Sequence, residues 1–145
     1  MSKSNAFESA LLALIFQNTN IANIGDATGL RGAAAAGQLF AALHTADPGE
    51  AGTQTTSEVA YTGYARVGLA RSSAGFTITG NSVSPAANVD FPACTAGSAT
   101  ATHFSIGVAS TGAGMVLYKG AITPTIAIAP GVTPRLDMAT AITED

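Results

Sequence analysis

The chain has little charge, no tryptophan and a single cysteine. Charged residues make up 10% of its 145 residues, whereas soluble domains usually contain about 25%. Short Ala, Gly, Ser and Thr side chains are expected to cover much of the rest of the surface. Such side chains lose little conformational entropy when a partner covers them. The composition therefore favours a surface that neighbouring subunits bury, although many monomeric β domains share it.

The scarcity of cysteine and of basic residues excludes several classes of site. With Cys94 alone, the chain cannot form an intrachain disulfide framework or a cysteine-based metal cluster, and we expect Cys94 to be a small buried hydrophobic side chain. The net charge is −3, and the basic residues are too scattered to neutralise a row of phosphates, so direct nucleic-acid binding is not expected. The basic residues are Lys3, Arg31, Arg66, Arg71, Lys119 and Arg135.

No long hydrophobic run is present either. The apolar run from Ala10 to Phe16 is too short for a membrane span, which needs about 20 residues. Glu8 interrupts the basic flank of a signal peptide, and polar residues 17–20 stand where a cleavage site would be expected. We therefore predict no secretion signal, no membrane interaction and assembly in the cytoplasm.

The segment around that apolar run has the pattern of a helix. Asn5 can cap it, with Glu8 three residues later as in a capping box. Apolar side chains lie on both faces, so the helix could pack on its own sheet or dock on a neighbouring subunit. Both alternatives stay open. The candidate partner-binding side chains are Phe7, Leu11, Leu12, Ile15 and Phe16.

We expect a single domain over residues 1–145, with an N-terminal helix or anchor at 1–20, a Gly/Ala-rich loop or arm at 21–38 and a β-sandwich at 39–145. The glycines of residues 21–38 are not followed by Gly-Lys-Ser/Thr, which excludes a phosphate-binding loop. Beyond residue 38, short alternating segments are separated by turn signals, without helical patterns between them. The predicted fold class is therefore all-β, an antiparallel β-sandwich or small barrel with one short N-terminal α-helix. The predicted strands include residues 39–45, 76–79, 101–108, 115–119, 122–128 and 135–138.

Catalytic or metal-binding chemistry is not indicated. His44 and His103 have no second histidine or carboxylate at a metal-ligand spacing. Asp47 and Glu50 flank a Pro-Gly turn, where an aspartate commonly bonds its own backbone instead of acting as an acid or base. We predict a protein that is not an enzyme and that holds no cofactor and no metal.

Two pairs of residues near the middle of the chain are candidates for a more specific role. Glu58 and Arg66 could form an ion pair that orients the loop at residues 47–57. Tyr61 and Tyr64, which lie between them, are candidate surface contacts, since tyrosine gives a large contact area at a low entropy cost. The pair is expected to be structural, with the tyrosines as the alternative site for a glycan or a protein.

Spaced segments along the chain resemble a family of small tailed-bacteriophage virion proteins that are often labelled tail-fibre-like or uncharacterised. No single motif is chemically diagnostic, but the spaced combination covers nearly the whole chain. The segments that carry the resemblance are residues 43–52, 57–59, 64–66, 89–93, 102–107 and 141–145.

The resemblance implies a structural protein of the virion, located on the capsid exterior or the tail. A single compact domain without repeats or coiled-coil heptads favours a capsid decoration or cement protein that stabilises the major capsid lattice. Such a protein is expected to bind the major capsid protein and its own copies, with a trimer as the favoured oligomer. The alternative is a tail-associated or fibre-associated protein that contacts tail proteins or a glycan on the host surface.

Overall fold

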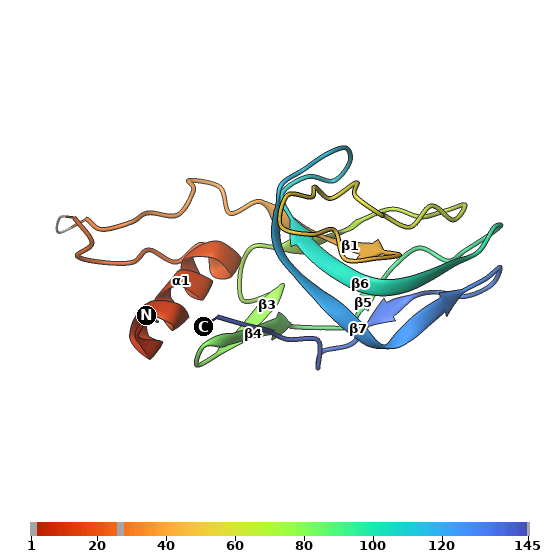
Figure 1. Cartoon of the computed structure of the whole chain (residues 1–145). Helices are drawn as coiled ribbons and strands as arrows, with labels where there is room; N and C mark the ends of the chain where they lie inside the picture. Colours follow the sequence, from red (N-terminus) through yellow and green to blue (C-terminus); the bar gives the residue numbers. More distant parts are fainter. Residues whose placement is uncertain (1–2, 26–27, 145) are drawn as a thin grey trace. The chain divides into compact units, whose positions relative to one another are not determined.

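The computed structural model of the chain describes residues 3–25 and 28–144 (Figure 1). Strands make up 39% of the chain and lie in antiparallel sheets, and 9% belongs to the one short helix of the described residues. These features confirm the predicted all-β class with one N-terminal helix. Whether the sheets form a sandwich or a small barrel stays a prediction.

The chain forms two compact units, and each is assembled from separate stretches of sequence. Unit 1 consists of Met1–Gln38, Leu69–Asn88 and Asp137–Asp145, and unit 2 consists of Leu39–Gly68 and Val89–Leu136. The predicted division instead placed all residues from 39 onward in one β body. The two units alternate along the sequence. The expectation of a single domain stays a prediction.

The helix of unit 1 is α1 (Asn5–Gln17). It begins at Asn5 itself, one residue before the start expected if Asn5 were the cap. Ser4 is the N-cap, with extended backbone and a hydroxyl that accepts a hydrogen bond from the Phe7 amide. The predicted capping role of Asn5 is therefore wrong, because Asn5 is already helical. At the other end Asn18 takes up a left-handed conformation with φ of 57°, which asparagine tolerates better than most residues.

Arg71 stabilises the C-terminal end of α1. Its Nε donates to the Ile15 carbonyl and its Nη2 donates to the Leu14 carbonyl, each over 2.6 Å. The last carbonyls of a helix lack partners within the helix and carry a partial negative charge. The half-buried guanidinium of Arg71 provides these carbonyls with hydrogen-bond donors and places a positive charge beside them.

A three-stranded antiparallel sheet packs against α1 in unit 1. The Phe16 ring meets the Phe76 ring edge-on, with 4.9 Å between centroids, and Leu12 and Val83 are buried with them. The C-terminal residues contribute the third strand, which the sequence pattern did not predict. The sheet has the order β3 (Phe76–Thr79), β4 (Ser82–Pro85), β9 (Ile142–Thr143).

The predicted arm between α1 and the first strand is pinned at its base. The side-chain amide of Asn18 pairs with the backbone of Ala33 in both directions, at 2.9 and 2.7 Å. Further along, Ile21 and Leu30 form an antiparallel bridge. We call residues 18–25 and 28–37 the arm.

The main sheet has four strands, and most of it belongs to unit 2. Its register includes Leu43 opposite Phe104, two side chains that share a buried face. Gly120 lies opposite Phe104 on the next strand, and a Cβ there would come within 2.9 Å of the Phe104 ring. The sheet has the order β2 (Val67–Ala70), β1 (Gln38–His44), β6 (Ala99–Gly107), β7 (Val116–Ile128), with the unit boundary inside β2 and after the first residue of β1.

Strand β7 joins two segments that the sequence predicted as separate strands. Its pairing with β6 changes register between His103, opposite Ala121, and Ala101, opposite Ile126. The residues at the predicted break, 120 and 121, are therefore paired with β6 like their neighbours, and the irregularity lies further along, between Ala121 and Ile126.

A two-stranded sheet, β5 (Val89–Asp90) with β8 (Arg135–Leu136), completes unit 2. The strand predicted at residues 135–138 corresponds to β8. Cys94 is fully buried in the same unit, as expected.

Candidate functional site

Glu58 and Arg66 form a two-pronged ion pair at the connection between β6 and β7. The Arg66 Nε lies 2.7 Å from Glu58 Oε1, and Nη2 lies 2.8 Å from Oε2. The Arg66 side chain is only 2% exposed. Because the carboxylate accepts two of its hydrogen bonds, the pKa of Arg66 is raised.

The same guanidinium also holds the β6–β7 connection. Its Nη1 donates to the Ala109 carbonyl at 2.9 Å and its Nη2 donates to the Gly112 carbonyl at 2.8 Å. We expected the pair to orient the loop at residues 47–57, and this stays a prediction. Arg66 in addition fixes the backbone of residues 109–112.

Tyr61 points into unit 2, which corrects its expected role as a surface contact, whereas Tyr64 is half-buried and its surface role stays a prediction. Tyr61 is 4% exposed, and its hydroxyl donates to the Pro92 carbonyl at 2.7 Å. The Tyr64 hydroxyl donates to Glu58 Oε1 at 2.9 Å and accepts from the Leu43 amide. Burial raises the pKa of both phenols. The rings pack edge-on at 5.4 Å, so they serve the core of the unit.

His44 and Ser105 resemble a general base and its nucleophile, but they are closed to solvent. The two lie 2.8 Å apart, Nε2 to Oγ, and both are completely buried. His44 Nδ1 lies 2.9 Å from the Thr56 carbonyl, an acceptor only, so Nδ1 carries the proton and Ser105 donates to Nε2. Burial lowers the pKa of His44, which keeps the ring neutral. The pair joins β1, β6 and the loop at residues 45–57.

Gln54 is a buried organising residue that the sequence did not reveal. Its Oε1 accepts from the Ala109 amide at 2.9 Å, and its backbone amide donates to the Gly114 carbonyl at 2.9 Å. The side chain lies against Gly107, where a Cβ would come within 2.2 Å of it. Gln54 stands in a run of polar residues, 53–56, whose composition indicates only an exposed loop.

An exposed cluster of charges lies on the surface of unit 2. The Lys119 ammonium is 3.0 Å from a carboxylate oxygen of Asp47 and 3.0 Å from one of Glu50. The Gly49 amide and Lys119 together lower the pKa of Asp47. Exposed pairs of this kind are screened by solvent and contribute little to stability. The cluster contains two carboxylates and one ammonium, so it has one negative charge in excess.

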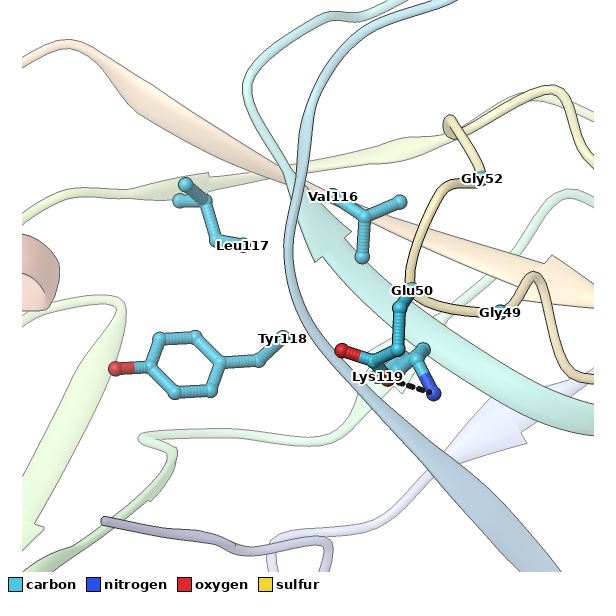
Figure 2. A pocket seen from close by; sticks show the side chains of 7 residues that line it. All are labelled: Gly49, Glu50, Gly52, Val116, Leu117, Tyr118 and Lys119. Atoms are coloured by element: carbon cyan, nitrogen blue, oxygen red, sulfur yellow. Dashed lines mark ion pairs between the residues drawn. The ribbon is translucent and has the colours of Figure 1, made fainter.

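A shallow open pocket of about 280 Å³ lies beside this cluster. Figure 2 shows Glu50 and Lys119 joined by their ion pair, with Gly49 and Gly52 on the adjoining loop. The remaining lining residues are consecutive on β7: Val116, Leu117, Tyr118 and Lys119. We call this pocket the groove.

The five apolar residues predicted to bind a partner differ in their exposure to solvent. Leu12 and Phe16 are completely buried within unit 1, so in this fold they support the helix instead of offering a surface. Leu11 and Ile15 are half-buried. Phe7 is the most exposed of the five, at 37%.

Within residues 3–25 and 28–144, no group of three or more His, Cys, Asp or Glu residues could hold a metal ion. The one helix described, α1, is not long and apolar enough to cross a membrane.

A family model described as "Podophage GP4 fiber I protein gp80" matches residues 2–142, nearly the whole chain. No curated protein matches the chain.

Proposed function

Because this chain belongs to the podophage GP4 fiber I protein gp80 family and is a structural protein of a phage virion, we propose that it is a fibre-associated building block that works through contacts between protein subunits. The family match over residues 2–142 is the observation that carries this proposal. The word "fiber" in the family description favours this location over the capsid lattice.

The polar network of unit 2 supports a mechanical role. Arg66 and Gln54 together bind four backbone groups of residues 109–114, and His44 ties two strands to a loop. Buried and fully bonded networks make one arrangement of the backbone much more stable than its competitors. A virion component that bears load benefits from such fixed loops.

We also propose that the protein is not an enzyme. The pair that most resembles catalytic machinery, His44 and Ser105, is completely buried, and its ring nitrogens and hydroxyl bond within the protein. A general base must reach the proton that it abstracts from a substrate or nucleophile. In this fold a substrate has no access to it.

The composition supports assembly from many copies. A surface this poor in charge carries a low desolvation cost when another subunit covers it. We propose a homo-oligomer, with a trimer as the favoured number, in contact with other tail proteins. The predicted decoration of the capsid lattice, with the major capsid protein as partner, is the second candidate, since the compact units lack the heptads and repeats of a fibre shaft.

The copy number of the chain in purified particles tests both locations. Quantitative mass spectrometry against the major capsid protein should give a few copies per hundred capsid subunits if the protein belongs to a fibre. A ratio near one to one would replace the fibre proposal with capsid decoration. Absence from purified particles would contradict every virion role.

A further inference from the structure

Two buried networks of unit 2 meet at the connection between β6 and β7, residues 108–115. Ala109 is their common point: its amide donates to Gln54 Oε1 and its carbonyl accepts from Arg66 Nη1, each over 2.9 Å. Arg66 also binds the Gly112 carbonyl. The backbone of this connection is therefore held by two side chains that lie outside it.

Both networks lead back to His44. Its Nδ1 donates to the carbonyl of Thr56, in the turn that also carries Gln54. Glu58, which holds Arg66 by two hydrogen bonds, lies opposite His44 in an antiparallel bridge. One imidazole thus lies at the start of each route to the β6–β7 connection.

A proton on His44 changes the hydrogen bonds that its ring can make. In the neutral ring Nε2 accepts from the Ser105 hydroxyl, but both nitrogens of an imidazolium are donors, so the hydroxyl loses its acceptor. Both side chains are closed to solvent, and a buried cation is costly without water or further acceptors around it. Because a backbone ladder holds β1 to β6, the loop at residues 45–57 is the part that can move away and admit water.

The groups that face His44 act in both directions. Burial has the largest effect and lowers the pKa of His44, whereas the Thr56 carbonyl and the Glu58 carboxylate act against that lowering. Arg66, and His103 directly opposite on β6, add to the lowering of the pKa. A closed site therefore resists the proton, and an opened site accepts it more readily. The other titratable side chains nearby already bond one another or Glu58: Tyr64, Asp47, Glu50 and Lys119.

We propose that protonation of His44 releases the loop at residues 45–57 and, with it, the β6–β7 connection. The connection is then ordered at neutral pH and mobile in mild acid. Histidine suits such a switch because its charge changes near neutral pH, and the two networks are the element whose order it controls. This inference goes beyond the proposed function, because it concerns the response of one surface to pH and holds wherever in the virion the chain is located.

Release of the connection changes the exposed surface of unit 2. Val108 and Met115, at its two ends, are 45% and 61% exposed, more than any other large apolar side chain of the unit. The Val108 amide donates to the Met115 carbonyl at 3.2 Å, which keeps the two ends together while the connection is ordered. The switch therefore acts on the part of unit 2 where large apolar side chains are most accessible.

Amide hydrogen exchange of the full-length chain at about pH 7.5 and about pH 4.5 tests the local release. Protection factors, which correct for the intrinsic effect of pH on exchange, should fall at least about tenfold in acid for the amides of Gln54 and Ala109. The Cys94 amide, which donates to Val132 in the same unit, should keep its protection. Equal losses at all three amides would mean global unfolding and would overturn the proposal, as would unchanged protection at Ala109.

An NMR titration assigns the release to His44 itself. In the wild-type chain the imidazole signals of His44 and the amide signal of Ala109 should move with one midpoint. His44→Gln keeps a donor and an acceptor but does not titrate, so the acid response at Ala109 should disappear. His103→Gln, the matched change on the opposite strand, should leave that response in place.

Two results of this titration would overturn the proposal. One is a pair of separate midpoints for His44 and Ala109 in the wild-type chain, and the other is an acid response that survives His44→Gln. The wild-type titration decides the question even if the glutamine variant fails to fold.

Discussion

The Nε2 atom of His44 lies 2.8 Å from the hydroxyl of Ser105, and neither side chain is reached by solvent. This bond crosses from β1 to β6, while the other ring nitrogen bonds the Thr56 carbonyl. One neutral imidazole therefore holds three segments together, which makes the fold sensitive to its protonation.

Acid should destabilise the protein through His44. Burial lowers its folded-state pKa below the ordinary 6.5, so below that pH the unfolded chain binds a proton that the folded chain resists. The free energy of unfolding should therefore fall as the pH drops below about 6.5 and should not depend on this group above it. Urea denaturation at several pH values measures the slope, and His44→Gln should flatten it. An unchanged slope in that variant would assign the effect to another group.

Removal of either partner of the Glu58–Arg66 pair should be costly. Arg66→Ala should lower the free energy of unfolding by roughly 3 kcal/mol or more, because it leaves a largely buried carboxylate without its cation. Arg66→Lys should recover only part of this loss, since an ammonium cannot reproduce the two-pronged geometry. Chemical denaturation measures both variants, and equal stability of the lysine variant and wild type would show that geometry is unimportant here.

Gly107 should tolerate alanine less well than Gly120 does. A Cβ at Gly107 would overlap the middle of the buried Gln54 side chain, whereas one at Gly120 would meet only the edge of the Phe104 ring. We expect Gly107→Ala to cost about 1–3 kcal/mol and Gly120→Ala to cost less, in parallel thermal denaturation. Gln54→Ala combined with Gly107→Ala should cost less than the sum of the two single variants. Additive costs would mean that Gln54 is not what Gly107 accommodates.

Phe16 and Phe7 should differ sharply in their importance for stability. Phe16→Ala should cost about 3–5 kcal/mol, because the ring is completely buried against Phe76. Phe7→Ala should change the free energy of unfolding by less than about 1 kcal/mol, since the ring is 37% exposed. Denaturation of both variants in urea compares them directly. Similar costs would show that α1 buries more of Phe7 than the fold indicates.

The local pattern of the sequence was enough to predict the helix and most strands. The alternating residues at 76–79 correspond to β3, because a period-two pattern reflects one buried face of a strand. The apolar run at 39–45 corresponds to β1, in which consecutive residues are buried. The exact helix cap was missed, since Ser4 and Asn5 are both good capping residues. Preferences of this kind cannot separate two adjacent candidates.

The buried polar network could be predicted only in part. Glu58 and Arg66 are close in sequence and opposite in charge, which suggested their pair, but the acceptors at Ala109 and Gly112 lie over forty residues away. Gln54 and the inward direction of Tyr61 depend on long-range contacts as well. The composition and the spacing of residues do not indicate which distant segments come into contact.

The alternation of the two units along the chain limits how the gene can be exchanged between phages. The chain passes from one unit to the other after residues 38, 68, 88 and 136. A single recombination junction anywhere between these points would join fragments from two parents inside at least one hydrophobic core. Inheritance of this gene as an undivided cassette is therefore favoured, and hybrids with distant relatives should survive mainly when their junctions fall outside it.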